Sequence, residues 1–185
     1  MDNGASSYRR FLDGDDNGIV EIIKEYKYGL TLFLNEYLNN ITEAEDAMED
    51  TFFVLVAKKP KFNGKSTFRS WLYSIGRNIA VDRIRRSAKN PSIPVDALED
   101  TLAEEKTVEE TYLEQERKLM LHRIMKKLNA DYRRVLYLAY FEDFDNAQTA
   151  KAMGKSKRQI ENLLYHAKSA LKKELEKEGF DYENR

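Results

Sequence analysis

The chain has 185 residues, a net charge of −1 at pH 7 and a charged fraction of 34%, above the roughly 25% of an average soluble domain. It contains no cysteine, which excludes disulfides, thiolate metal sites and cysteine nucleophiles, and its apolar runs are far shorter than the ~18 residues of a membrane span. Its 8 glycines and 3 prolines predict an all-α protein, and the lack of a signal-like N-terminal segment predicts a cytoplasmic location.

Three helices are predicted in the first half of the chain. Apolar residues recur every three or four positions over residues 19–37, which is the pattern of an amphipathic helix. A second helix is predicted to begin at Thr42, whose hydroxyl pairs with Glu45 in the pattern of a capping box, and to end before Pro60. A third helix is predicted over residues 67–86, with Phe68 in the core.

Charge is distributed in blocks along the sequence. Residues 58–89 hold ten basic side chains and a single acid, whereas residues 91–110 hold seven acids, one lysine and two prolines. Residues 151–173 are basic again, with a single acid. We therefore expect two small helical domains, residues 1–88 and 111–178, joined by a flexible acidic linker over residues 89–110.

The second domain is predicted to contain a helix-turn-helix. Helices are expected around residues 121–128 and 135–138, and Asp145 with Gln148 predicts a capping box at the start of a short helix that ends at Gly154. Ser156 is then placed to cap a last helix. The small Ala150, the turn glycine and the apolar Ile160 have the spacing of two closely crossing helices, although Thr149 and Lys155 occupy positions where such motifs usually have aliphatics.

Two further patterns bear on function. Residues 62–78 interleave aromatic and basic side chains, a pattern typical both of a packed core and of single-stranded nucleic-acid binding. Five acidic residues between Glu43 and Asp50 fit either a solvated helix start or a protein-docking face better than catalysis. No metal-ligand spacing, phosphate-binding loop or nucleophile motif occurs, so we predict no catalytic, cofactor or metal residues and no enzyme activity.

In combination, these features resemble a bacterial RNA polymerase sigma factor of the small extracytoplasmic-function type. The resemblance covers about residues 8–177. It is carried by AEDAMEDTFFVLVAKK (44–59), FNGKSTFRSWLYSIGRNIAVDRIRR (62–86), LNADYRRVLYLAYFEDF (128–144) and AQTAKAMGKSKRQIENLLYHAKSALKK (147–173). These stretches are similar to sigma region 2, which binds core polymerase and melts the promoter, and to sigma region 4.

The resemblance implies roles for individual residues. The residues that the resemblance implies for docking on the coiled coil of the β′ clamp are Glu45, Asp46, Glu49, Asp50 and Phe53. Contacts to the −10 promoter element fall to Phe62, Lys65, Ser66, Arg69, Trp71, Arg77 and Asn78. Contacts to the −35 element fall to Lys157, Arg158, Asn162, His166 and Lys168. The implied partners are core RNA polymerase, through its β′ clamp and β subunit, promoter DNA and, as in many family members, an anti-sigma factor, without membrane insertion.

Some positions depart from the family pattern, and two other interpretations stay open. Asn129-Ala130 replaces a frequent Pro-Pro, and Glu161, Asn162 and Leu163 stand where many members have lysine, serine and arginine, which lowers the positive charge toward the −35 element. Leu163 is expected in the core. A free-standing helix-turn-helix regulator explains the C-terminal block alone, and a structural helical adaptor explains the helices but not the two basic blocks.

Overall fold

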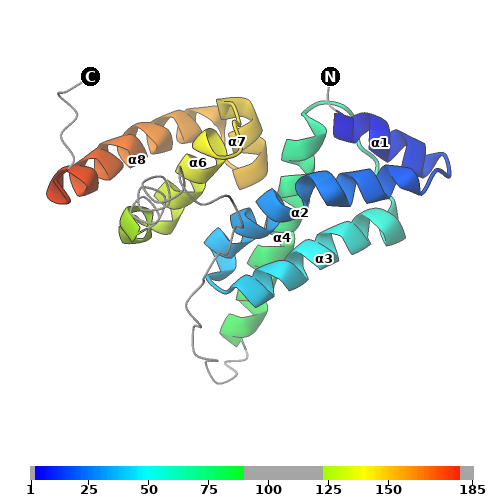
Figure 1. Ribbon diagram of the computed structural model, residues 1–185, viewed down its shortest axis with the longest axis horizontal. Coiled ribbons are helices and arrows are strands. Elements are labelled where there is room, and N and C mark those ends of the chain that lie inside the picture. The colour runs from blue at the N-terminus through cyan, green and yellow to red at the C-terminus, as the bar shows by residue number, and fades with distance from the viewer. Residues whose placement is uncertain (1–2, 90–122, 180–185) are drawn as a thin grey trace, which may run out of the picture.

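The chain folds into helices in all the parts that the structure describes. The computed structural model describes residues 3–89 and 123–179, and within these ranges it contains no strand (Figure 1). The predicted all-α class is therefore confirmed. The predicted acidic linker, except Lys89, lies outside the described residues. None of the described helices combines the length and the apolarity that crossing a membrane requires.

The N-terminal unit is a bundle of four helices arranged around α2. Their bounds are α1 Asn3–Leu12, α2 Asn17–Leu38, α3 Ile41–Lys58 and α4 Phe68–Lys89. The predicted first, second and third helices correspond to α2, α3 and α4. Helix α2 packs against the other three, and its Ile22, Leu30 and Phe33 are fully buried. Phe68 of α4 is also fully buried, as predicted.

Helix α1 is an element that the periodicity analysis did not identify. Its Tyr8 and Phe11 are buried, and the Tyr8 hydroxyl donates a hydrogen bond to the Pro60 carbonyl at 2.8 Å. The Tyr8 ring packs against the rings of Phe68 and Trp71. Burial raises the pKa of Tyr8 to about 12. Tyr8 and Phe11 are thus part of the core of this unit. The hydrogen bond to Pro60 joins α1 to the loop before α4.

The predicted capping box at the start of α3 is wrong. Asn40 is the N-cap: it is extended, and its side-chain oxygen accepts from the Glu43 backbone N–H at 3.1 Å. Because the asparagine two residues earlier caps the backbone, the helix already includes Thr42, which is exposed. Thr42 and Glu45 are therefore ordinary helical positions.

The C-terminal unit contains the helix-turn-helix. Residues 123–127 are helical, and α6 Ala130–Tyr140, α7 Asn146–Met153 and α8 Lys157–Lys177 follow. The capping box of Asp145 and Gln148 is confirmed, as is the Ser156 cap, which Gln159 completes as a second capping box. Asn129, at the position of the family's proline pair, caps α6 by accepting from the Tyr132 N–H at 2.9 Å.

The two units lie against each other. Helix α7 packs on α4, and α6 packs on α2 (Figure 1). Buried residues of both units form a continuous apolar cluster that includes Tyr73 of α4 and Phe144, which precedes α7, with ring centroids 5.3 Å apart. The faces of α4 and α7 that meet here are therefore inside the protein in this arrangement.

Candidate polymerase and nucleic-acid interfaces

Helix α3 carries an acidic and aromatic face, which we define as Glu45, Glu49, Phe53 and Val56. These residues follow each other at three- and four-residue spacing, so they lie on one side of the helix. All four are exposed, and Phe53 leaves 66% of its surface open. Within the described residues, neither Glu45 nor Glu49 forms an ion pair. An exposed phenylalanine beside unpaired carboxylates is a surface suited to a basic partner with an apolar pocket.

The other two predicted acidic residues, Asp46 and Asp50, are exposed but have a partner that the sequence did not disclose. Arg83 of α4 reaches Asp50 at 2.6 Å, Glu43 at 3.1 Å and Asp46 at 3.7 Å. The hydrogen bond to Asp50 is the first cause that raises the pKa of Arg83. This cluster, the Arg83 brace, joins α3 to α4. Asp46 and Asp50 are thus engaged in the fold, unlike Glu45 and Glu49.

The loop before α4 and the first half of α4 hold the predicted −10 residues in different environments. Lys65 and Asn78 are exposed, and Ser66 is half-buried. Phe62 and Trp71 are half-buried and pack on each other with ring centroids 5.2 Å apart. These two rings are therefore partly core residues, and only their outer surfaces are accessible to a base.

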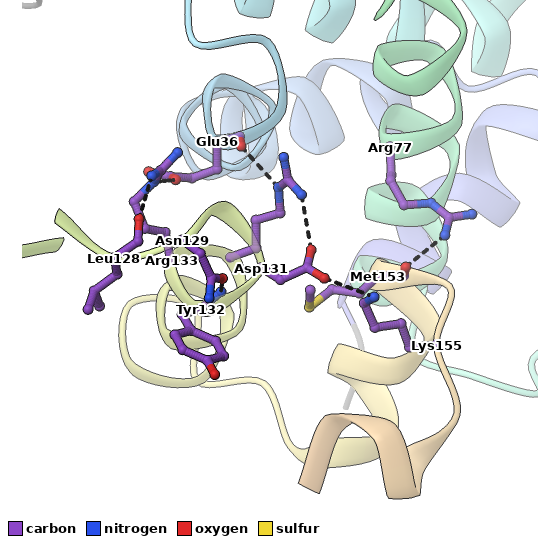
Figure 2. A network of polar contacts seen from close by, with 10 residues as sticks. Glu36, Arg77, Leu128, Asn129, Asp131, Tyr132, Arg133, Met153 and Lys155 are labelled. Carbon is purple, nitrogen blue, oxygen red and sulfur yellow. Dashed lines mark hydrogen bonds and ion pairs between the residues drawn. The ribbon is translucent and has the colours of Figure 1, made fainter. Parts of the chain in front are cut away.

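The remaining two −10 residues, Arg69 and Arg77, contact the C-terminal unit. Arg69 forms an ion pair with Glu142 and donates to the Glu142 carbonyl at 2.8 Å. Arg77 donates to the Met153 carbonyl at 2.8 Å, as Figure 2 shows, and to the side-chain oxygen of Asn78 at 2.5 Å. The structure thus divides the seven predicted residues into three groups. Lys65 and Asn78 are open to solvent, Ser66, Phe62 and Trp71 are half-buried in their own unit, and Arg69 and Arg77 contact the C-terminal unit.

The helix-turn-helix has the geometry that its spacing predicted. Gly154 ends α7 in the left-handed conformation with φ 63°, and both Ala150 and Ile160 are buried. The two positions that depart from the usual motif have different environments. Thr149 is buried, and Lys155 extends its ammonium group to Asp131 at 3.0 Å, so it links the turn to α6 (Figure 2).

Helix α8 presents the predicted −35 residues together on its outer side. Lys157, Arg158, Asn162, His166 and Lys168 are all exposed. Tyr165 adds a ring that is 72% exposed beside His166, whereas Leu163 is half-buried against the core. The start of this helix combines exposed cations and an exposed amide beside the Ser156 capping box, which suits a duplex groove and its phosphates.

Comparisons with known proteins agree with this geometry. Residues 22–90 match Sigma-70 region 2, and residues 118–171 match Sigma-70, region 4. The chain is 24% identical over 172 residues to the ECF RNA polymerase sigma factor SigW of Bacillus subtilis, covering 88% of this chain and 91% of SigW. It is 22% identical over 171 residues to the RNA polymerase sigma-H factor of Pseudomonas aeruginosa, covering 88% and 89% of the two chains.

Two solved structures share the fold. The first is CnrH in complex with the cytosolic domain of CnrY, with a TM-score of 0.60, 20% identity and coverage of 94% of this chain and 95% of the other. The second is the sigma factor RpoE with the anti-sigma factor NepR from Bartonella quintana, with a TM-score of 0.62, 20% identity and coverage of 84% and 97%. The match to region 2 excludes a free-standing helix-turn-helix regulator and a purely structural adaptor. The chain belongs to the sigma-70 family of RNA polymerase sigma factors, in its extracytoplasmic-function group, a family without enzyme activity whose members direct RNA polymerase to promoters.

Proposed function

We propose that this sigma factor divides its work among three surfaces: the acidic and aromatic face of α3 for core polymerase, the Phe62–Thr67 loop with α4 for the −10 element, and the start of α8 for the −35 element. The observation that carries this proposal is the chemical contrast between exposed faces. Helix α3 exposes carboxylates around Phe53, whereas α8 exposes Lys157, Arg158 and Lys168.

Docking on polymerase is assigned to α3 because of what surrounds Phe53. A large exposed ring gains most of its binding energy when a partner desolvates it, and neighbouring carboxylates steer a basic partner toward it. Glu45 and Glu49 have this position. Asp46 and Asp50 contribute charge, but their first role is in the Arg83 brace.

Opened promoter DNA is assigned to the loop and α4. Lys65 supplies a cation for phosphate, and the outer faces of Phe62 and Trp71 offer stacking surfaces, each worth about 1–3 kcal/mol per base. Asn78 is exposed and carries both a donor and an acceptor, which a base edge requires and a lysine does not provide. We assign base recognition in the −10 element to Asn78.

Asn78→Ala tests this assignment on a promoter found by mapping the transcripts that core polymerase starts in the presence of this chain. We expect less open complex on duplex DNA and the same defect on a template melted in advance, because a lost base contact is missing on both. A Lys172→Ala variant, which removes an exposed charge from the far part of α8, serves as control. A defect that disappears on the melted template, or no defect on either, contradicts base recognition by Asn78.

The same proposal covers location and regulation. We propose that the chain acts in the cytoplasm, where core polymerase is, with domain boundaries at residues 1–88, 89–110 and 111–178. An anti-sigma protein is a candidate regulator, since both structural neighbours above were solved as complexes, one of them with an anti-sigma factor. Competition between such a protein and core polymerase for this chain is the test, and simultaneous binding of both would contradict this form of regulation.

A further inference from the structure

We propose that α1 positions the loop that meets the −10 element, with Tyr8 as the positioning residue. The proposal rests on the role assigned above to the Phe62–Thr67 loop and α4. It adds a helix that lies before residues 22–90, the residues that match Sigma-70 region 2. Tyr8 is buried, so it acts on nucleic acid only through the residues that it holds in place, Pro60 and Trp71.

The hydroxyl of Tyr8 holds the beginning of this loop. Helix α3 ends at Lys58, and Lys59 turns the chain with a left-handed φ of 43°. The carbonyl of the next residue, Pro60, accepts the hydrogen bond from the Tyr8 hydroxyl at 2.8 Å. The Lys59 ammonium nitrogen lies 5.0 Å from the centroid of the Phe11 ring of α1. Two side chains of α1 thus fix the point where the chain leaves α3.

The ring of Tyr8 supports the two aromatic residues that are assigned to base stacking. It is 1% exposed, and its centroid lies 5.5 Å from that of Trp71 and 5.4 Å from that of Phe68. Phe62 packs in turn on Phe68 at 5.7 Å and on Trp71 at 5.2 Å. Because Phe62 and Trp71 are half-buried, each ring has an inner side in this cluster and an accessible outer side. Tyr8 therefore belongs to the layer directly beneath the stacking surface.

Helix α1 is held firmly enough by α2 to serve as this support (Figure 1). Gly18 of α2 allows a close approach, since a Cβ there would stand 2.2 Å from the Ser7 carbonyl oxygen and 2.8 Å from the Phe11 backbone nitrogen. Glu21 of α2 accepts from the Ser7 hydroxyl at 2.7 Å and forms an ion pair with Arg10. These contacts place α1 without any help from the loop.

The loop itself is a segment that gains from such a support. It contains no helix between Pro60 and α4, and it turns at Gly64 with a φ of 70°. The Lys65 backbone N–H donates to the side-chain oxygen of Asn63 at 3.1 Å, which is a contact within the loop. A loop that is already held in its binding conformation loses less entropy when a ligand binds. The hydrogen bond to Pro60 should therefore contribute to the affinity for DNA as well as to stability.

The test compares Tyr8→Phe, which removes the hydroxyl and keeps the ring, with Thr51→Val as the matched control. The buried Thr51 hydroxyl also donates to a carbonyl, that of Ala47 at 2.7 Å, but this bond lies within α3. Both variants should lose a similar amount of stability in urea unfolding, since each loses one hydroxyl bond. A purely structural role of Tyr8 predicts that the two variants also behave alike in the measurements below.

The first measurement is the fluorescence of Trp71, the only tryptophan in the chain. Because Trp71 packs on Tyr8 and Phe62, displacement of the loop should expose more of its indole ring. We expect stronger quenching by acrylamide and emission at longer wavelength in Tyr8→Phe, and wild-type values in Thr51→Val. Gly18→Ala, which displaces α1 and leaves the loop residues unchanged, should produce the same shift as Tyr8→Phe. It takes the place of Tyr8→Phe if that variant does not fold.

The second measurement is binding of holoenzyme to the promoter template melted in advance. One hydrogen bond is worth about 2- to 12-fold in an equilibrium constant, so Tyr8→Phe should weaken this binding by up to about 12-fold. The affinity for core polymerase should stay at the wild-type value. When Phe62→Ala is already present, Tyr8→Phe should weaken binding by a smaller factor, because both changes act on the same stacking surface.

The outcomes separate this proposal from the proposed function. Unchanged Trp71 fluorescence in Tyr8→Phe and Gly18→Ala overturns the positioning role and leaves the DNA contacts of the loop intact. Altered fluorescence with unchanged binding to the melted template also overturns it, because the loop then binds without support. A Phe62→Ala variant that binds the melted template normally contradicts the stacking assigned to the loop, whatever Tyr8→Phe does. Altered fluorescence together with weaker binding, neither of them seen in Thr51→Val, is the predicted result.

Discussion

Two matched charge reversals on α3 should separate polymerase binding from folding. Glu45→Lys with Glu49→Lys changes the acidic and aromatic face, whereas Asp46→Lys with Asp50→Lys changes the Arg83 brace. Both double variants alter the net charge equally, at neighbouring positions of the same helix. They differ in that only the second pair contacts Arg83, at 3.7 Å and 2.6 Å.

The structure gives the size of the expected difference. The carboxylates of the brace are more than half exposed, so each ion pair is worth about 0.2–1 kcal/mol. Loss of two such pairs, followed by repulsion of similar size between the new lysines and Arg83, should lower the free energy of unfolding by about 1–3 kcal/mol. Lysines at positions 45 and 49 are not paired with Arg83, and they repel each other across one helical turn about as the two glutamates do, so this pair should change it by no more than about 0.5 kcal/mol in total.

Urea unfolding followed by circular dichroism measures the free energy of unfolding. Binding of the labelled chain to core polymerase measures the affinity of the docking face. At a slope of about 1–3 kcal/mol per M urea, the brace variant should shift the midpoint by about 1 M, and the face variant should shift it by less than about half of that. The face variant should nevertheless lose core binding. Arg83→Glu, added to the brace variant, should recover part of the lost stability. Equal midpoints for the two variants would refute the brace, and core binding retained by the face variant would refute the docking face.

Three further predictions concern a cap, the −35 contacts and pH. Asn40→Ala should lower the free energy of unfolding by about 0.5–2 kcal/mol while Thr42→Ala leaves it nearly unchanged, and equal losses in thermal melting would contradict the cap seen here. In binding of holoenzyme to duplex DNA, Arg158→Ala should lower the binding free energy at the −35 element by about 1–3 kcal/mol and relax the sequence preference there. Lys168→Ala should weaken binding to all sequences alike. The reverse pattern would contradict these two roles. Burial raises the pKa of Tyr37 from 10.0 to about 12, so the contribution of its protonated hydroxyl to the free energy of unfolding should be complete below pH 10 and lost as the pH rises toward 12. If a Tyr37→Phe variant loses the same amount of stability between pH 10 and pH 12 as the wild type, this prediction is contradicted.

Helix positions and most exposed faces followed from local sequence. Periodicity located α2, α3 and α4, and the motif Asp145-x-x-Gln148 identified its capping box, because both signals act within a few residues. The predicted cap of α3 was wrong because two polar residues, Asn40 and Thr42, can both cap the start of this helix. The sequence alone does not show which of them does so. Helix α1 has only two buried large side chains, Tyr8 and Phe11, too few for a periodic pattern to stand out.

The contacts that could not be predicted are those between distant residues. Glu142 meets Arg69 across 73 positions of the chain, and Arg83 meets Glu43 across 40. In sequence these are ordinary charged residues, and their burial or pairing depends on how helices of different segments pack. For the same reason the sequence predicts Arg69 and Arg77 as −10 contacts without a sign that Arg69 pairs with Glu142, between α6 and α7, and that Arg77 bonds to Met153 of α7.

Transcription by core polymerase on fragmented genomic DNA from the organism that encodes this chain tests the central claim most directly. With chain and core together, mapped 5′ ends should appear downstream of a shared pair of upstream elements, and the set should vanish when Glu45 and Glu49 are replaced by lysine. Neither component alone should produce it. If instead the chain alone binds specific duplex sites tightly at physiological salt and adds no new 5′ ends with core, its assignment as the promoter-specificity subunit of RNA polymerase is contradicted.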